Sequence, residues 1–161
     1  MSAMKTLILA LALFGVSCTT VQPSTQTSLE VLWVGTYSVE SSTRVDDPST
    51  ATGTVLRSIG TKPLEKTTQI PARIGVRFGF GYRLIAPNAV SPVILKTVKL
   101  YPPGGMTNPA NGRTVERYEG LLPCNIVETC WTGFAFEQPW ELIPGIWTMQ
   151  IWQGSTLLAN Q

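Results

Sequence analysis

The stretch RIGVRFGFGYRL, residues 73–84, decides the fold, because its apolar side chains recur at every second position. A strand places alternate residues on opposite faces, whereas a helix would spread them around its circumference. The sequence therefore predicts one strand over Arg73–Leu84, long enough at about 3.3 Å per residue to bend or to pass between sheets. The expected inward residues are Ile74, Val76, Phe78, Phe80, Tyr82 and Leu84, and the outward face carries Arg73, Arg77 and Arg83 between glycines.

Shorter alternating runs lie on both sides of this strand. Within residues 93–101 the apolar phase changes, which predicts a β-bulge near Lys96. Trp33 and Trp147 lie on apolar faces and are expected in the core. The predicted strands are 29–40, 51–59, 66–70, 93–101, 132–136, 147–151 and 157–161, with 51–59 and 66–70 as Thr-rich edge strands.

Turn residues separate these runs, and no helical period appears after the N-terminal segment. Prolines 102 and 103 cannot continue a ladder, Asn111-Gly112 is a tight-turn dipeptide, and Gly154-Ser155 separates two apolar runs. The fold class that this pattern predicts is all-β: an antiparallel, immunoglobulin-like β-sandwich of seven to nine strands.

The N-terminal segment resembles an export signal. Lys5 precedes an apolar run from Leu7 to Val16, which is too short to span a bilayer as a helix. Gly15-Val16-Ser17-Cys18 resembles a lipobox, which makes Cys18 the expected lipidation site; ordinary signal-peptidase cleavage near Ser17 fits as well. We expect a signal peptide over 1–17, a flexible tether over 18–28 and one domain over 29–161. The expected product is a membrane-anchored lipoprotein facing the periplasm, or else a soluble periplasmic or secreted protein.

Composition excludes several classes of function. Once Lys5 leaves with the signal, 11 of the 12 Lys and Arg residues remain against 10 acidic residues, so nothing favours nucleic acid as a partner. Histidine is absent, which excludes His-dependent catalysis and ordinary His-containing zinc sites, and we expect no metal and no cofactor. Membrane contact is expected only through the lipid. Cys124 and Cys130 are expected to form a structural disulfide in an oxidising compartment.

Three groups of side chains are candidates for binding or chemistry. Arg73, Arg77 and Arg83 could grip carboxylates or phosphates, although a solvated face with Glu partners is the simpler interpretation. Trp131, Trp140 and Trp152 lie out of phase with apolar faces or at strand ends, and they would form a sugar platform or cap the sandwich. Glu137 and Glu141 flank a tryptophan, as catalytic carboxylates of glycosidases can, but cross-strand salt bridges with arginines are the simpler interpretation.

Three segments together are similar to a bacterial family known only as a domain of unknown function. They are TQIPARIGVRFGFGY (Thr68–Tyr82), LYPPGGMTN (Leu100–Asn108) and WTGFAFEQPWELIPGIWTMQIWQG (Trp131–Gly154). The resemblance implies an uncharacterised domain, often behind an export signal, with no assigned functional residue. The segment from Pro144 to Leu158 also resembles the last hairpin of immunoglobulin-like domains.

These observations favour a non-enzymatic cell-envelope domain that is structural or binds a partner, either an envelope protein or a glycan. A carbohydrate or peptidoglycan-binding module is the alternative, and an enzyme that uses Glu137 and Glu141 is the third hypothesis. The surface distinguishes them, because a sugar platform needs clustered exposed tryptophans and an enzyme needs a cleft at Glu137.

Overall fold

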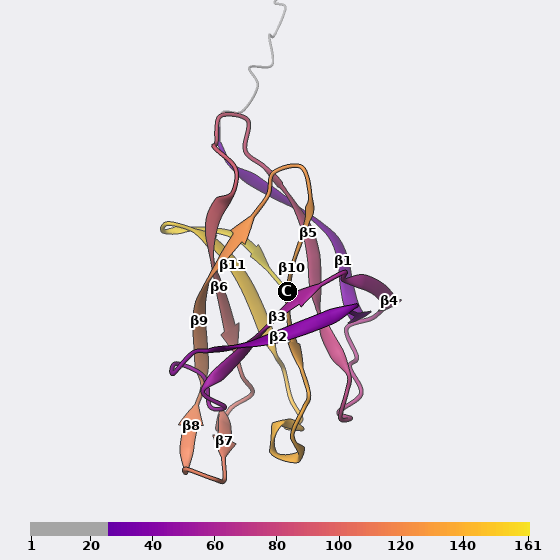
Figure 1. Ribbon diagram of the computed structural model, residues 1–161, viewed down its shortest axis with the longest axis vertical. Coiled ribbons are helices and arrows are strands. Elements are labelled where there is room, and N and C mark those ends of the chain that lie inside the picture. Colours follow the sequence, from indigo (N-terminus) through magenta and orange to yellow (C-terminus); the bar gives the residue numbers. More distant parts are fainter. Residues whose placement is uncertain (1–25) are drawn as a thin grey trace, which may run out of the picture.

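The structure is a computed structural model that describes residues 26–161, and its centre is a sandwich of two four-stranded antiparallel sheets (Figure 1). One sheet has the order β10-β5-β1-β4, and the other has the order β12-β11-β6-β9. Two hairpins, β2–β3 and β7–β8, add four strands. The elements are β1 Ser28–Ser38, β2 Ser41–Asp46, β3 Thr54–Ile59, β4 Lys62–Lys66, β5 Arg77–Ile85, β6 Val93–Leu100, β7 Met106–Asn108, β8 Arg113–Val115, β9 Arg117–Cys124, β10 Thr129–Ala135, the 3-10 turn η1 Pro139–Glu141, β11 Thr148–Gln153 and β12 Thr156–Asn160.

The predicted signal peptide, Cys18 and the tether as far as residue 25 lie outside the described residues. β1 begins at Ser28, which is where the predicted tether ends. No helix within residues 26–161 is long and apolar enough to cross a membrane.

β5 supplies the centre of the core, as its alternation predicts. Phe78, Phe80, Tyr82 and Leu84 are all buried, and β1 and β10 pair with β5 on its two sides. Directly paired residues in neighbouring strands face the same side of a sheet. The inward face of the sheet therefore continues from β5 onto both neighbours.

The prediction fails at the start of this strand. The backbone of Gly75 has φ +87°, and the Val76 N–H donates to the Arg73 carbonyl at 3.1 Å, so the chain turns there. Ile74 is 48% exposed instead of inward, and Val76 is half-buried against the core. β5 is consequently shorter than predicted, runs from Arg77 to Ile85, and stays in one sheet.

A bulge in β1 corrects the expectation for Trp33. The register shifts between Val31 and Trp33, so that Trp33 pairs with Gly81 on the outer face while Val34 pairs with Phe80 on the inner face. The Trp33 indole N–H donates to the Thr36 carbonyl at 3.3 Å, and Trp33 is half-buried outside the core. Trp147 is in the core as predicted, with ring contacts to Phe78, Tyr101, Phe134 and Phe136.

β6 contains no bulge at Lys96, so that prediction is wrong. Its residues pair one by one with β9 from Val93 to Leu100 without a register shift. Leu95, Thr97 and Lys99 share the inward face, whereas Val98 is buried on the opposite face. The apolar phase changes because a polar pair, Thr97 and Lys99, points inward.

Several strands lie where the sequence pattern is silent. The side chains of β2 are exposed along its whole length, so no apolar alternation marks it. The expected edge strand at 66–70 is absent, and its place beside β1 belongs to β4, which contains Pro63 as edge strands can. The predicted turns at Asn111-Gly112 and Gly154-Ser155 are present, the first between β7 and β8 and the second between β11 and β12.

The disulfide joins the edges of the two sheets. Cys124 ends β9 and Cys130 lies at the start of β10, with their Cα atoms 5.7 Å apart. Each of these strands is the last in its sheet. The bridge closes a loop of about seven residues, for which chain entropy gives about 2.4 kcal/mol of stabilisation. It therefore holds β9 and β10 together at one end of the open edge of the sandwich.

Candidate functional site

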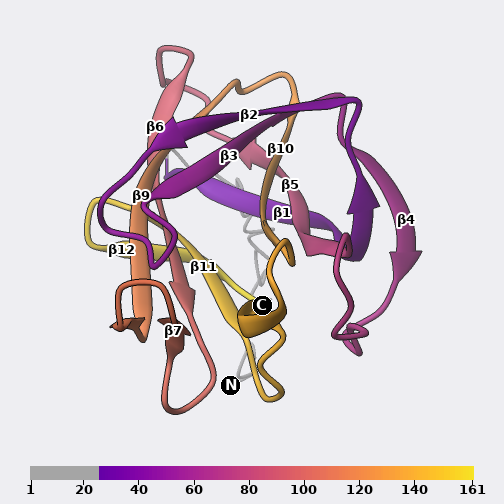
Figure 2. The same cartoon turned by 60° about the horizontal axis from the view of Figure 1, so that its bottom comes forward.

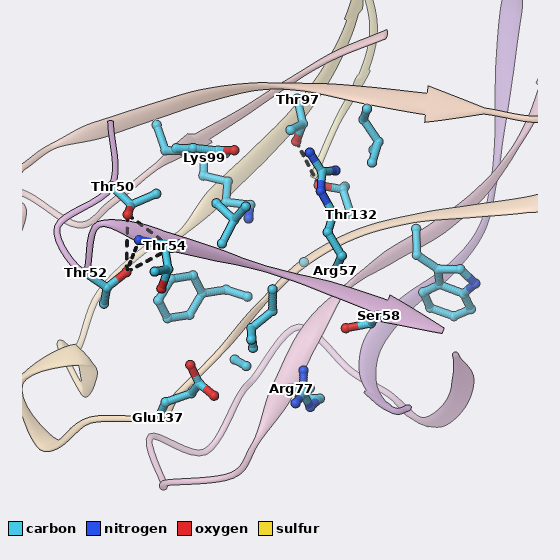
Figure 3. A pocket seen from close by; sticks show the side chains of 18 of the residues that line it. Thr50, Thr52, Thr54, Arg57, Ser58, Arg77, Thr97, Lys99, Thr132 and Glu137 are labelled. Carbon is cyan, nitrogen blue, oxygen red and sulfur yellow. Dashed lines mark hydrogen bonds between the residues drawn. The ribbon is translucent and has the colours of Figure 1, made fainter. Parts of the chain in front are cut away.

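A cleft of about 330 Å³ lies between the β2–β3 hairpin and the edge strands β9 and β10. The hairpin crosses from the side of β9 to the side of β10 in both views of the whole molecule (Figures 1 and 2). Residues of β3 form one wall, residues of β6, β9 and β10 form much of the rest, and Tyr37 of β1, Arg77 of β5 and residues of β7 and η1 complete the lining. Figure 3 shows the side chains that line it.

The floor of the cleft is polar, although it continues the inward face of the sandwich. Thr97 of β6 and Thr132 of β10 are buried, and their hydroxyl oxygens lie 2.8 Å apart in one hydrogen bond (Figure 3). This bond links the two sheets. Lys99 follows Thr97 on the same face of β6 and extends into the cleft.

Lys99 is the most unusual side chain of the cleft. Its Nζ lies 5.1 Å from the ring centroid of Tyr118 and 6.0 Å from that of Phe134. Among the described residues, no carboxylate lies within salt-bridge distance of this ammonium group. The pKa of Lys99 is lowered to about 8, mainly by burial and also by the Arg57 guanidinium, while Asp47 acts in the opposite direction. An anion beside the Lys99 ammonium group would reduce the free-energy cost of keeping this charge partly out of water.

The other cations of the cleft are also without acidic partners in the part of the chain that the structure describes. Arg57 donates to a backbone carbonyl of β9 at 3.5 Å, and Arg77 forms no ion pair. Two carboxylates, Glu137 and Glu141, also line the cleft, so the cleft at Glu137 that the enzyme hypothesis needs is present, but both side chains have partners. Glu137 pairs with Arg44 at 2.9 Å, and Glu141 accepts two backbone N–H groups of the loop before η1. Burial raises the pKa of the Glu141 carboxyl, and these two bonds oppose the shift. Within residues 26–161, the three cations of the cleft therefore form no ion pair, although two glutamates share its lining.

Asp47, a third carboxylate close to the cleft, stabilises the β2–β3 hairpin. It accepts hydrogen bonds from Ser49 and, at 3.1 Å, from the Tyr118 hydroxyl of β9. Burial acts to raise the pKa of Asp47, but these hydrogen bonds and the nearby Arg57 guanidinium together outweigh it, so the net pKa is lowered. Burial and the neighbouring Asp47 raise the pKa of Tyr118 to about 12. This contact ties the hairpin to the sandwich beside the cleft.

An aromatic wall borders the cleft where β10 meets β1 and β5. The rings of Tyr37 and Trp131 lie 5.5 Å apart, and Trp131 packs across Gly81, where a Cβ atom would meet the indole at 2.9 Å. Burial raises the pKa of Tyr37 to about 12, with Arg77 acting in the opposite direction. The glycines of β5 therefore leave the space that these two rings occupy.

The three arginines predicted to form one row are separated in the structure. Arg73 is exposed in the turn before β5, and Arg83 pairs with Glu30 of β1 at 2.6 Å. Only Arg77 of the three lines the cleft. The row fails because the turn at Gly75 removes Arg73 from the strand.

The three candidate tryptophans likewise occupy separate places, so a shared platform is not formed. Trp131 lines the cleft, and Trp140 packs in η1 against a second small core cluster around Tyr101 and Met106. Trp152 lies in the other sheet, where its ring is 5.4 Å from Lys96 Nζ and its indole N–H donates to Gln150. All three are half-buried.

A second cavity of about 470 Å³ lies at the opposite side of the core. Phe78, Phe80, Trp147 and Met149 line it together with the loops 67–72 and 143–146. Its lining contains no charged side chain. No cluster of three His, Cys, Asp or Glu side chains that could hold a metal occurs within residues 26–161.

Sequence reasoning missed Arg57, Thr97, Lys99 and Thr132 as site residues. For Thr97 and Lys99, the change of apolar phase in residues 93–101 was the available signal. Two polar residues at positions of a strand that face inward indicate a place where the core is open. Arg57 had no such signal, since β3 reaches the cleft only through the path of the hairpin.

Comparison with known proteins supports the fold and places the chain in a family. The chain is similar to an immunoglobulin-like protein from Pseudomonas aeruginosa, with a TM-score of 0.61, 20% identity, and coverage of 84% of this chain and 93% of that chain. At this identity the similarity shows the fold alone. None of the curated proteins matches the chain. The model of a domain of unknown function (DUF3859) matches residues 26–161, so the chain belongs to this family, which the resemblance of its three segments predicted.

Proposed function

We propose that this protein is an exported, non-enzymatic binding domain of the bacterial cell envelope, and that it takes its partner into the cleft under the β2–β3 hairpin. One observation carries the proposal: Lys99, Arg57 and Arg77 line this cleft without carboxylate partners among the described residues. Among the other cations of residues 26–161, five have such partners, including Arg83 and Lys96, and the three that have none, Lys66, Arg73 and Arg113, are exposed. Unpaired charge in a concave, partly aromatic site is typical of a binding site.

Export is supported by the N-terminal sequence, and lipidation of Cys18 can be tested directly. We expect a protein expressed with its own N-terminus to incorporate an alkyne fatty acid, because Cys18 ends the lipobox-like segment. Click chemistry and in-gel fluorescence measure the label. The Cys18→Ser variant should lose it. Full labelling of that variant, or none of the wild type, would show that ordinary secretion applies.

Binding at the cleft can be tested by crosslinking in cells. We expect the wild-type protein to give specific crosslinked products in the envelope fraction, and Lys99→Met to reduce them at least fivefold, because the charge that faces the partner is removed. The matched control is Lys96→Met, which removes a lysine from the other face of the same strand. Equal products from both variants would place binding elsewhere, and an absence of products from the wild type would contradict a binding role.

A further inference from the structure

We propose that the cleft binds an anionic sugar residue, meaning a hydroxyl-rich ring that carries a carboxylate or a phosphate. The inference rests on the proposed function, since it names the ligand class of the same cleft. Three features of the cleft support it: its charge, its unused hydroxyl group and its aromatic wall.

The charge indicates an anion. Lys99 enters from β6 and Arg57 from β3, and the two cations repel each other across a partly desolvated space (Figure 3). Asp47 offsets part of this repulsion, but among the described residues neither cation has a carboxylate within salt-bridge distance, so the two like charges remain unfavourable in the free protein. An anionic group between them would remove this repulsion and accept hydrogen bonds from both side chains.

The hydroxyl groups indicate a polar ligand with acceptor atoms. Thr97 and Thr132 share one hydrogen bond, and one of their two hydroxyl protons has no acceptor among the described residues. Each hydroxyl can donate one bond and accept two. The pair is therefore able to donate to a ligand oxygen and to accept from a ligand hydroxyl, which is the combination that a sugar offers.

The aromatic wall and the size of the cleft favour a ring. Trp131, Tyr37 and Arg77 line the cleft on the outer side of the edge strand β10, whereas Thr132 and Lys99 line it on the inner side, so a ligand that contacts both groups lies across this edge. The C–H face of a pyranose packs against aromatic rings, whereas a simple inorganic anion gains nothing from them. A cavity of about 330 Å³ is at the small end of ligand pockets, which suits one or two rings.

Isothermal titration of the purified protein with four probes tests the proposal: D-glucuronate, glucose 6-phosphate, D-glucose and inorganic phosphate. We expect at least one of the two acidic sugars to bind at least tenfold more tightly than both glucose and phosphate. Whether glucuronate or glucose 6-phosphate binds more tightly distinguishes a carboxylate from a phosphate ligand. Equal affinity for glucose would remove the role of charge, and equal affinity for inorganic phosphate would remove the role of the ring.

Variants connect the binding to this cleft. Lys99→Met and Arg57→Gln should each weaken binding of the acidic sugar at least tenfold, whereas Lys96→Met, on the opposite face of β6, should leave it unchanged. Circular dichroism checks that each variant is folded. Unchanged binding in both cleft variants would overturn the proposal. If no acidic sugar binds but Lys99→Met still removes crosslinks in cells, the ligand class is wrong and the binding function stands.

Discussion

Replacing Phe78 by alanine is expected to reduce the free energy of unfolding by about 3–5 kcal/mol, the usual cost of truncating a buried phenylalanine. Phe78 lies at the centre of the core and has ring contacts with Phe134, Phe136 and Trp147 at centroid distances of 6.1, 5.0 and 5.4 Å. The truncation would leave a void lined by these rings, which β5 and β10 hold in fixed register. Denaturant melts of the two proteins measure the difference.

The control for this prediction is Ile74→Ala. Sequence alternation places Ile74 on the same inward face as Phe78, but the turn at Gly75 leaves it 48% exposed. We therefore expect Ile74→Ala to reduce stability by under about 1 kcal/mol. If Ile74→Ala were as destabilising as Phe78→Ala, the strand would begin at Arg73, and the turn in the structure would be wrong.

The sequence predicts the part of the fold in which one face is apolar. β5 has strict alternation from Phe78 to Leu84, and that alternation fixes both its type and its inward face. The turn before β5 is missed because Ile74 and Val76 continue the same alternation on either side of Gly75. Alternation of apolar residues cannot show that the backbone turns out of the strand at a glycine. β2 is missed for the opposite reason, since a strand exposed on both faces has no period to detect.

The cleft is harder to predict, because it is assembled from strands that are distant in the sequence. Arg57 of β3 and Lys99 of β6 meet only because the β2–β3 hairpin crosses the open edge between β9 and β10. Neither residue has a neighbouring motif that marks it. The sequence does show the three arginines and the three tryptophans as candidate groups. In the structure, a turn separates the arginines, and the tryptophans lie in different elements.

A half-buried cation without an ion-pair partner should reduce stability, so Lys99 tests whether this position serves the fold or the cleft. At pH 7 both the folded and the unfolded chain hold the Lys99 proton, and the folded chain bears the desolvation cost. The difference between a pKa of 10.5 and one of about 8 corresponds to at most about 3 kcal/mol, and the partial exposure of Lys99 to solvent reduces this cost. A residue that destabilises the free protein by this amount is typical of a binding site.

We therefore expect Lys99→Met to increase the free energy of unfolding at pH 7 by up to about 3 kcal/mol, since methionine keeps the apolar stem without the charge. Between pH 8 and about 10 the folded wild type releases the Lys99 proton while the unfolded chain retains it, so wild-type stability rises with pH and the advantage of the variant shrinks. Above that range the raised pKa values of Tyr37 and Tyr118 lower stability in both proteins, because the folded state then holds more protons.

Urea melts at pH 7 and pH 9.5 measure this difference, and Lys96→Met is the matched control. Lys96 lies in the same strand but pairs with Glu119 at 3.5 Å on the exposed face, so its removal should change stability by under about 1 kcal/mol at both pH values. A Lys99→Met protein less stable than the wild type at pH 7 would show that the ammonium group is well solvated or paired. The same result would contradict the argument for an anionic ligand, because that argument requires a Lys99 ammonium group that has no partner in the free protein.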